Sequence, residues 1–562
     1  MLSSLILLVL VWLCTPEGLG VSPDSTQYLA TARSVASGDA PMTVWWLGRP
    51  EPLAHFPPVY PLVIAFITRL GLSAPQAAWL VQLVLAPTNV ILTAWCASRI
   101  AGGTSAQRRR LGMVAALATA ASTTVLIVHS MAWSEPLFIS LLLGAMLCLG
   151  DAVDSAQSRR APSAPAALAL SGILMGVATI TRYAGVAFVG GATLLILIQK
   201  RYTVRDRVVR ATLFATLSVM PLVCWLLYNE ARGTTGTNRE IAFHPVPPRE
   251  WAEIAKPIGR WFVPSLDARP FQLIALVLCA VLLLALLVTS GRFGMGRGPR
   301  QHVAGSRASA DSEWRAPSAS LAMICAVLPA CYLAFLIVSK TFLDRAIDLD
   351  DRLLSPILPP IIALVTSTVA LRLRRPPALT RGSWNGVRST VLVSVALYFV
   401  SQALGSIRYW RRVHETGVGV KAEARNAPAL IQLSRALPRG ARMYSNLPYV
   451  IFGVTGRMVR GLPLRASSTS LRPNPRFEQD VMEIGGGTRD PTYVLYFGSG
   501  DDTGVITVKE LQRRFPRART HAVPGGLFVE MSAGSVDRAA GGDVASSPSQ
   551  SGSGVEARKQ GD

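Results

Sequence analysis

Long apolar runs, separated by short polar stretches, dominate the first 405 residues of the chain. A helix needs about 20 mostly apolar residues to cross the hydrocarbon core of a bilayer. Runs of this kind predict spans near residues 1–15, 75–97, 111–129, 136–150, 165–181, 184–199, 209–228, 271–290, 317–339, 353–371 and 389–405. The pattern therefore predicts a mainly α, polytopic membrane bundle of about eleven transmembrane helices in residues 1–405. The first run is short, and no Lys or Arg precedes it, so we interpret it as a first transmembrane helix rather than a signal peptide.

The polar stretch 16–74 interrupts this pattern but does not resemble a linker. It contains an amphipathic helical pattern over 25–37, the turn "HFPPVYP" at 55–61 and a short apolar segment at 60–72. Arg69 interrupts that segment, and burying it at the bilayer centre would cost about 2.5–3.5 kcal/mol. We therefore expect 60–72 to lie at the membrane interface and 16–74 to form a structured external loop.

Residues 406–532 have a different pattern, in which short helical and strand-like segments alternate. "APALIQLSRALP" and "ITVKELQRRFP" have helical periodicity, whereas "ARMYSN", "PTYVLYFG" and "GGLFVEM" are typical of short strands. These segments predict a small α/β domain. The tail 533–562 is rich in Ser and Gly and lacks aromatic residues, so we expect it to be disordered.

Charge then sets the expected orientation. The formal net charge is +23, and arginines collect in five loops between the spans, namely "SRIAGGTSAQRRR", "SRR" (158–160), "KRYTVRDRVVR", "GRFGMGRGPR" and "LRLRRPP". The positive-inside rule makes these loops cytoplasmic. The N-terminus is then cytoplasmic, and loop 16–74 and domain 406–532 are extracytoplasmic. Because the basic residues are spread over loops rather than gathered in one domain, nucleic acid is not an expected partner.

The cysteines and acids do not predict a metal site. All seven cysteines lie inside or at the edge of apolar segments, without metal-like spacing. The acids of "LDRAIDLDDRLLSP" do not follow a calcium-loop pattern. We expect no metal and no cofactor.

Four external loops carry residues suited to chemistry. Asp24 begins the first amphipathic helix, where an N-cap role is the simpler explanation. Glu135 begins a span, where a favourable interaction with the helix dipole is the simpler explanation. Arg182 lies in the turn "TRYAG", where it can snorkel, bind a phosphate or pair with a carboxylate. Arg352 lies just before the tenth span. His55 lies just before a double proline, and it is either a surface histidine at a turn or a hydrogen-bond donor to a phosphate.

Several motifs, taken in order, resemble a known family. "PDSTQYLATARSVASGD", "HFPPVYPLVIA", "SEPLF", "TRYAG", "YNEARGTTGTNR" and "DRLLSPILPP" resemble bacterial GT-C membrane glycosyltransferases. The resemblance is to the branch of the dolichyl-phosphate-mannose protein mannosyltransferases and the lipid A aminoarabinose transferases, over about residues 1–405. It implies transfer of a sugar from a polyprenyl-phosphate-sugar donor to a protein, lipid or glycan hydroxyl on the extracytoplasmic face of a bacterial inner membrane, with membrane lipids as surroundings.

The resemblance also implies roles for individual residues. Asp24 occupies the place of the acid that activates or positions the acceptor, with inversion at the anomeric carbon, and Glu135 is a second, orienting carboxylate. Candidate donor-phosphate ligands are His55, Arg182 and Arg352, and candidate substrate-binding residues are Tyr28, Tyr60, Tyr183 and Arg239. Many members carry paired acids in the first loop, whereas Ser25 follows Asp24 here; this departure favours a metal-independent mechanism.

Two alternatives remain open at this stage. A transporter or flippase of a lipid-linked glycan would need polar residues inside the spans, where Gln82 and Asn89 are the main examples. A non-catalytic scaffold of envelope glycan assembly is the other alternative, and the sequence does not exclude it.

Overall fold

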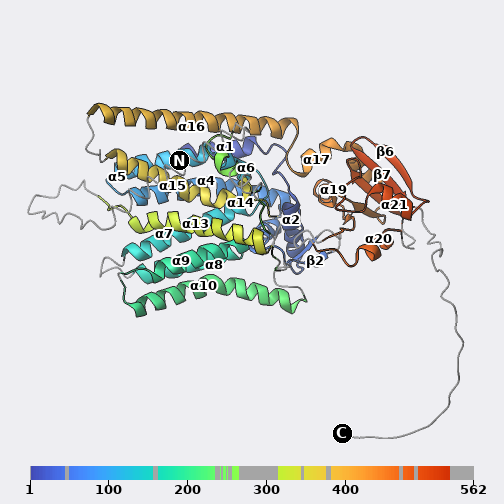
Figure 1. Ribbon diagram of the computed structural model, residues 1–562, viewed down its shortest axis with the longest axis horizontal. Helices are drawn as coiled ribbons and strands as arrows, with labels where there is room; N and C mark the ends of the chain where they lie inside the picture. Colours follow the sequence, from blue (N-terminus) through green and yellow to red (C-terminus); the bar gives the residue numbers. More distant parts are fainter. Residues whose placement is uncertain are drawn as a thin grey trace, which may run out of the picture.

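The computed structural model describes residues 2–44, 50–155, 163–200, 202–233, 241, 243, 245–247, 250, 256–264, 314–343, 347–374, 381–466, 472–485 and 491–531. Side-by-side helices form most of the molecule, and a small sheet domain lies beyond one end of them (Figure 1). The expected span 271–290, the candidate Arg239 and the tail 533–562 lie outside the described residues.

The helices of the bundle coincide with the expected spans that fall in the described residues. Their bounds are α1 (Leu2–Leu13), α4 (Ala74–Ala101), α5 (Ser105–Ala121), α6 (Thr123–His129), α7 (Glu135–Ser155), α8 (Ser163–Thr179), η1 (Tyr183–Gly185), α9 (Val186–Leu197), α10 (Val204–Ala231), α13 (Ala319–Phe342), α14 (Asp351–Leu354), η2 (Ser355–Ile357), α15 (Leu358–Arg374) and α16 (Arg381–Glu415). The last of these continues past residue 405.

Length and apolar composition identify which described helices are able to cross a membrane. Six qualify: Ala74–Ala101, Glu135–Asp154, Val204–Ala231, Ala319–Phe342, Asp351–Leu373 and Arg388–Glu415. A seventh span results if α5 and α6, which are bent by 64° at Ser122, count as one. Four shorter apolar helices accompany them. The protein is therefore a multi-pass, mainly helical membrane protein, whereas the total of about eleven spans stays a prediction.

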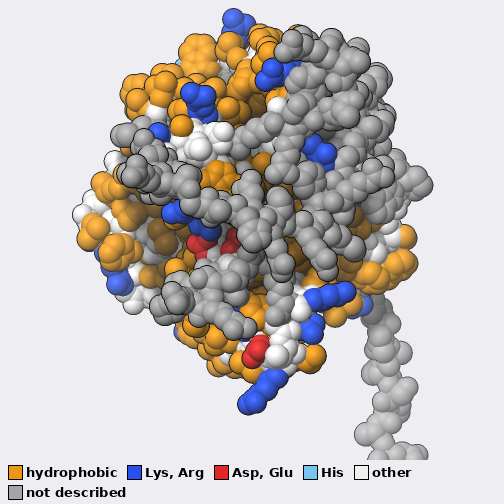
Figure 2. All heavy atoms as spheres, turned by 90° about the vertical axis from the view of Figure 1, so that its left-hand side faces the viewer, with side chains coloured by type: hydrophobic (Ala, Val, Ile, Leu, Met, Phe, Trp, Pro, Cys, Tyr) orange, Lys and Arg blue, Asp and Glu red, His pale blue; other side chains and the backbone are white. Residues whose placement is uncertain are grey.

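The end of the bundle opposite the sheet domain carries a sparse set of charges. Among its described residues, Figure 2 shows Lys and Arg side chains scattered between hydrophobic ones, and fewer acids. The chain's orientation in the membrane stays a prediction from its loop charges.

Loop 16–74 is folded, as the sequence predicted. It contains α2 (Pro23–Ala36), the antiparallel pair β1 (Met42–Val44) and β2 (Pro50–Pro52), and α3 (Val59–Arg69). The Arg69 guanidinium donates from Nη2 to the Val35 carbonyl at 2.7 Å, at the end of α2. The same carbonyl also accepts from the Gly38 amide at 3.1 Å, and the Arg69 contact joins α3 to α2.

The start of α2 differs from the simplest sequence-based explanation. Ser22, not Asp24, is the N-cap residue, and its hydroxyl accepts a hydrogen bond from the Ser25 amide at 3.3 Å. Pro23 takes the first helical position, where its missing N–H is not needed. Because Ser22 fills the capping role, the Asp24 carboxylate is available for other contacts.

The C-terminal sheet has five strands in the order β4-β3-β5-β7-β6. The strand β3 pairs in parallel with β4 and β5, and β7 pairs antiparallel with β5 and β6. The elements are α17 (Val420–Asn426), α18 (Pro428–Ala436), β3 (Arg442–Ser445), α19 (Pro448–Thr455), β4 (Arg460–Gly461), α20 (Phe477–Gly485), β5 (Thr492–Phe497), α21 (Val508–Arg514), β6 (Arg519–Val523) and β7 (Gly526–Met531). The expected α18, β3, β5, α21 and β7 are confirmed. The edge strand β6 was missed because most of its side chains are exposed and do not alternate.

Candidate functional site

Four charged side chains from four separate segments form a continuous chain of ion pairs at the end of the bundle facing the sheet domain. Arg352 Nη1 lies 2.6 Å from Asp24 Oδ2, and Arg352 Nε lies 2.5 Å from Glu135 Oε1. Arg182 Nη1 lies 2.6 Å from the same Glu135 oxygen. The order is Asp24–Arg352–Glu135–Arg182. The fold thus brings together four of the residues singled out from the sequence.

Burial differs along this chain of charges. The Glu135 side chain is 0% exposed, whereas Arg182, Arg352 and Asp24 are 12%, 15% and 29% exposed. A buried carboxylate is costly unless cations and hydrogen bonds compensate for its lost hydration. Two guanidinium groups do so for Glu135, and they leave Asp24 as the more accessible acid.

Local structure explains why Glu135 points into this cluster. It is the first residue of α7, directly after the turn that carries Trp133 and Ser134. The Ser134 hydroxyl accepts from Arg182 Nη1 at 3.1 Å and shares a hydrogen bond with the Tyr28 hydroxyl at 3.3 Å. Ser134 therefore links α2, the turn before α7 and the Arg182 turn. In the sequence, only the position of Ser134 next to Glu135 could have suggested this linking role.

Contacts with Trp133, and the engagement of the neighbouring acids elsewhere, determine where the Arg352 side chain points. Its guanidinium lies 4.7 Å from the centroid of the Trp133 ring, a cation–π distance. The Trp133 indole N–H in turn donates to the capping hydroxyl of Ser22 at 2.9 Å. The neighbouring acids serve other contacts: Asp350 caps α14 through the Leu353 amide, and Asp351 pairs with Arg260 at 2.7 Å. Arg352 is thus directed at Asp24 and Glu135.

The charges around Asp24 keep it ionised. Burial raises the pKa of Asp24, but Arg352 first, and then His55 and Arg182, outweigh this effect and bring the pKa below its ordinary value. The pKa of the neighbouring Tyr28 hydroxyl shifts in the opposite direction. Burial and the Asp24 charge raise the pKa of Tyr28 to about 12, so Tyr28 remains a neutral hydrogen-bonding group.

The aromatic candidates pack against one another, beginning with Tyr28, one helical turn after Asp24. The Tyr28 ring packs edge-on against Phe56 and Tyr60, with centroids 5.1 and 5.2 Å apart. Tyr60 is fully buried, and its hydroxyl accepts from Gln82 Nε2 at 3.2 Å. His55 packs on the other side of Phe56, at 4.7 Å between ring centroids. His55 therefore belongs to the same aromatic cluster, and its electrostatic interaction with Asp24 lowers the pKa of Asp24.

Tyr183 holds the chain just before His55. Its hydroxyl donates to the Ala54 carbonyl at 2.8 Å and accepts from the Trp225 indole N–H at 3.0 Å. These contacts connect the "TRYAG" turn, the "HFPP" turn and α10. In this structure Tyr183 therefore positions His55 rather than pointing freely toward a ligand.

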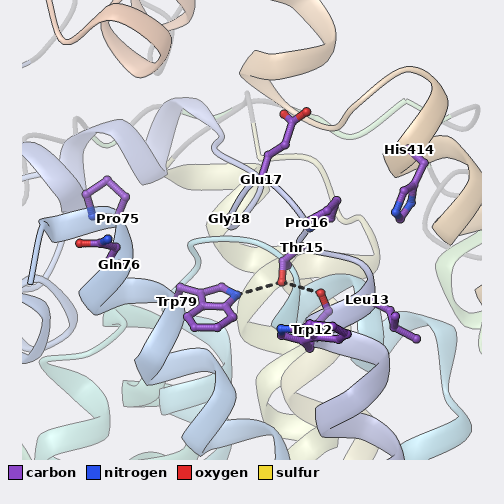
Figure 3. Close-up of a pocket in the computed structure, with 10 residues that line it drawn as sticks. All are labelled: Trp12, Leu13, Thr15, Pro16, Glu17, Gly18, Pro75, Gln76, Trp79 and His414. Carbon is purple, nitrogen blue, oxygen red and sulfur yellow. Dashed lines mark hydrogen bonds between the residues drawn. The ribbon is translucent and has the colours of Figure 1, made fainter.

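A cavity of about 610 Å³ lies apart from the charged cluster, between the end of α1, the start of α4 and the end of α16. Figure 3 shows residues that line it, among them Glu17, His414 and Trp79, whose indole N–H donates to the Thr15 hydroxyl at 2.9 Å. None of the four residues of the ion-pair chain lines this cavity.

The sequence matches no protein-family model and no curated protein sequence. Solved structures are nevertheless similar in fold over nearly the whole chain. ArnT from Cupriavidus metallidurans bound to undecaprenyl phosphate is 14% identical, with a TM-score of 0.58 over 94% of this chain and 97% of its own. The same protein in the apo state is 16% identical, with a TM-score of 0.57 over 95% and 98%.

A more distant similarity reaches another kind of enzyme. The Archaeoglobus fulgidus oligosaccharyltransferase in complex with Zn and sulfate is 10% identical, with a TM-score of 0.53 over 94% of this chain and 73% of its own. At such low identities these comparisons establish the architecture, and the chemistry has to be argued from the residues.

Proposed function

Because this chain has the GT-C fold expected from its sequence, we propose that it is a membrane glycosyltransferase that uses a polyprenyl-phosphate-sugar donor. The acceptor is a hydroxyl of a protein, lipid or glycan, and the transfer takes place on the extracytoplasmic face. A solved structure of this fold holds undecaprenyl phosphate, which is the carrier such a donor leaves behind. The observation that carries the proposal is the Asp24 carboxylate, which is partly exposed, does not cap α2 and is kept ionised by the neighbouring Arg352 guanidinium.

Asp24 is the proposed general base. It takes the proton of the acceptor hydroxyl while the acceptor oxygen attacks the anomeric carbon of the donor sugar. The new bond joins that oxygen to the anomeric carbon, and the bond from this carbon to the phosphate oxygen breaks. Polyprenyl phosphate leaves with one additional negative charge. Direct displacement of this kind inverts the anomeric configuration.

Arg352, Arg182 and His55 are the proposed stabilisers of the leaving phosphate. Charge that develops in a transition state is stabilised best by cationic groups already fixed in place. Glu135 supplies that fixation, since its buried carboxylate contacts both guanidinium groups. We therefore assign Glu135 the orienting role for catalytic side chains, not contact with the acceptor.

The contacts of the two acids support a metal-independent mechanism. Arg352 lies between Asp24 and Glu135 and neutralises both. Ser25, the residue that replaces a second loop acid, shares a hydrogen bond with the Ser22 hydroxyl at 3.0 Å. The carboxylates are therefore arranged for pairing with arginine.

The polar residues inside the spans favour this proposal over transport. Gln82 Nε2 donates to the Trp133 carbonyl at 2.8 Å, and Asn89 Nδ2 donates to the Pro136 carbonyl at 2.9 Å. Asn89 also contacts the ring of buried His129 and accepts from Ser140. These side chains support the turn that carries Glu135, so their place in the spans has a structural explanation.

The test is sugar transfer in membranes supplied with a panel of radiolabelled polyprenyl-phosphate sugars. Wild type transfers label from at least one donor, and Asp24→Asn lowers the rate about 10²–10⁴-fold, the usual contribution of a general base. Asp39→Asn is the matched control, since Asp39 is an exposed acid of the same loop, and it keeps the wild-type rate. Full transfer by Asp24→Asn at equal expression, or no transfer by wild type with any donor, contradicts the proposal.

A further inference from the structure

We propose that the C-terminal α/β domain is part of the transfer site, and that Gly419 is the positioning residue through which it sets the relative placement of Asp24 and Glu135. This inference rests on the proposed function, and it adds a role for a domain in which the sequence shows no catalytic motif.

Three chain segments meet side by side just before the two acids. Gly20 pairs in parallel with Met131, and Val21 pairs in parallel with Gly419. The Gly20 amide donates to the Ser130 carbonyl at 2.9 Å, and the Ala132 amide donates to the Gly20 carbonyl at 2.9 Å. We call this three-segment arrangement, 20–21 between 130–132 and 419–420, the clamp.

The outer segment of the clamp belongs to the α/β domain. The Val420 amide donates to the Val21 carbonyl at 2.8 Å, and Val420 begins α17. The chain 20–21 is therefore held by backbone hydrogen bonds on both sides, once by the bundle and once by the domain. In Figure 1 the helices α17 and α19 accordingly lie beside the end of the bundle that carries α2.

Close backbone approach requires glycine at position 419. Its φ is +59°, in the left-handed region, and a Cβ there would lie 2.1 Å from the Val21 carbonyl oxygen. A methyl group cannot be accommodated unless the backbone of Val21 or of the domain moves. Gly20 is similarly confined, because a Cβ would lie 2.2 Å from Met131 Sδ and 2.8 Å from Val418 Cγ2.

Side chains extend the same contact along α2. Arg33 lies 5.8 Å from the centroid of the Phe452 ring of α19. A Cβ at Gly453 would lie 3.1 Å from Val420 and 3.6 Å from Thr26 of α2. Next to the clamp, Arg425 Nη2 lies 3.0 Å from Glu17 Oε1. The domain thus packs against the helix that carries Asp24, at Thr26 and at Arg33.

The clamp fixes the relative position of Asp24 and Glu135, because each acid follows one of its segments directly along the chain. Asp24 lies in the first turn of α2, soon after Val21, and Glu135 begins α7, soon after Ala132. Each acid therefore sits on a first helical turn whose entry is fixed by the clamp. A shift between 20–21 and 130–132 changes the distance from Asp24 to Glu135, and Arg352 then loses contact with one of them.

The test compares two glycine-to-alanine variants in the full-length protein. Gly419→Ala places a methyl group against Val21, whereas Gly456→Ala, in the same domain, also has a positive φ of +71° but nothing within 4 Å of its Cβ. The two glycines share a positive φ but differ in ψ, which is −138° at Gly419 and 1° at Gly456, so the amount of folded protein is measured for each variant. We expect kcat for sugar transfer to fall about 10- to 100-fold in Gly419→Ala relative to Gly456→Ala, since small misplacements of catalytic groups have effects of this size. The KM for the donor should change far less.

Equal activity of the two variants would overturn the inference, and so would a fall in Gly419→Ala that is matched by an equal fall in the amount of folded protein. Inactive wild type contradicts the proposed function instead, so the two failures are distinguishable.

If Gly419→Ala does not fold, a charge exchange provides a second test of the same contact. Glu17→Arg places like charges beside Arg425 and should lower kcat, and Glu17→Arg with Arg425→Glu should restore it. Loss of kcat in the single variant without recovery in the double variant, at equal folding, contradicts the proposed role of the domain. So does a single variant with wild-type kcat.

Discussion

Arg352 and Asp24 form an ion pair, in which Arg352 Nη1 lies 2.6 Å from Asp24 Oδ2. The same guanidinium also contacts Glu135, and it rests on the ring of Trp133. One side chain therefore holds the accessible acid and the buried acid in a common site. This relationship gives most of the predictions that follow.

The first prediction concerns the shape of the Arg352 side chain. A guanidinium presents several donors in a fixed plane, whereas a lysine ammonium is a single charge on a flexible stem. Arg352→Lys should therefore keep only one of the two carboxylate contacts, and kcat/KM for sugar transfer should fall about 10²–10³-fold, as when one fixed donor is removed. Arg260→Lys, at a pair with a single contact to Asp351, is the control and should show a much smaller loss. Comparable losses in both variants contradict the bridging role.

The second prediction concerns the burial of Glu135. Glu135→Gln leaves Arg182 and Arg352 without their shared buried counter-charge, and breaking such a buried pair costs about 3–5 kcal/mol. The midpoint of thermal unfolding in detergent should fall clearly. Glu478→Gln removes the partner of Arg514 from an ion pair whose glutamate side chain is 69% exposed. That change should leave the midpoint of thermal unfolding almost unchanged, and a similar effect of both substitutions would argue against a buried charge network.

The third prediction follows from the direction of the Asp24 pKa. Because Arg352 brings this pKa below that of an unfolded aspartate, the ionised form stabilises the folded protein. This stabilisation is complete above the unfolded pKa of about 3.9 and is lost as pH falls through the folded pKa. The difference in thermal stability between wild type and Asp24→Asn should stay constant from about pH 8 to pH 5 and decrease below about pH 4. A difference that grows on acidification would show that the pKa is raised instead.

The fourth prediction concerns orientation in the membrane. Ser37 follows α2 and Ala106 lies in the first turn of α5, and both are exposed. In intact cells, a membrane-impermeant maleimide should label Ser37→Cys, whereas Ala106→Cys should react only after permeabilisation. Wild type, with its native cysteines, gives the background. The opposite labelling pattern would place Asp24 in the cytoplasm and would rule out the proposed site of transfer.

Local patterns in the sequence were sufficient for the elements that surround the site. The amphipathic and apolar segments predicted helices α2 and α3. Pro23, the first residue of α2, and the double proline before α3 are their start signals. Arg69 was expected at the interface because of the cost of burying it; this placement stays a prediction, and the structure shows that its guanidinium contacts the carbonyl of Val35.

Other features were ambiguous from sequence, for local reasons. Ser22 and Asp24 are both good N-cap residues, and only the backbone of α2 shows that Ser22 takes this role. The sequence also indicated that Glu135 begins a span, where its charge suits the helix dipole. It did not indicate that a second arginine, 217 positions away, would share that carboxylate with Arg182.

The sequence by itself determined the membrane class, the helical periodicity and the presence of acids and arginines in the loops between spans, because each depends on residues within about one helix length. The tertiary structure alone decided that Arg352 bridges Asp24 and Glu135, and that Gly419 approaches Val21, because these contacts depend on how distant segments pack. Hydrophobic patterning specifies which side of a helix is buried, but it contains no information on which distant loop will face it.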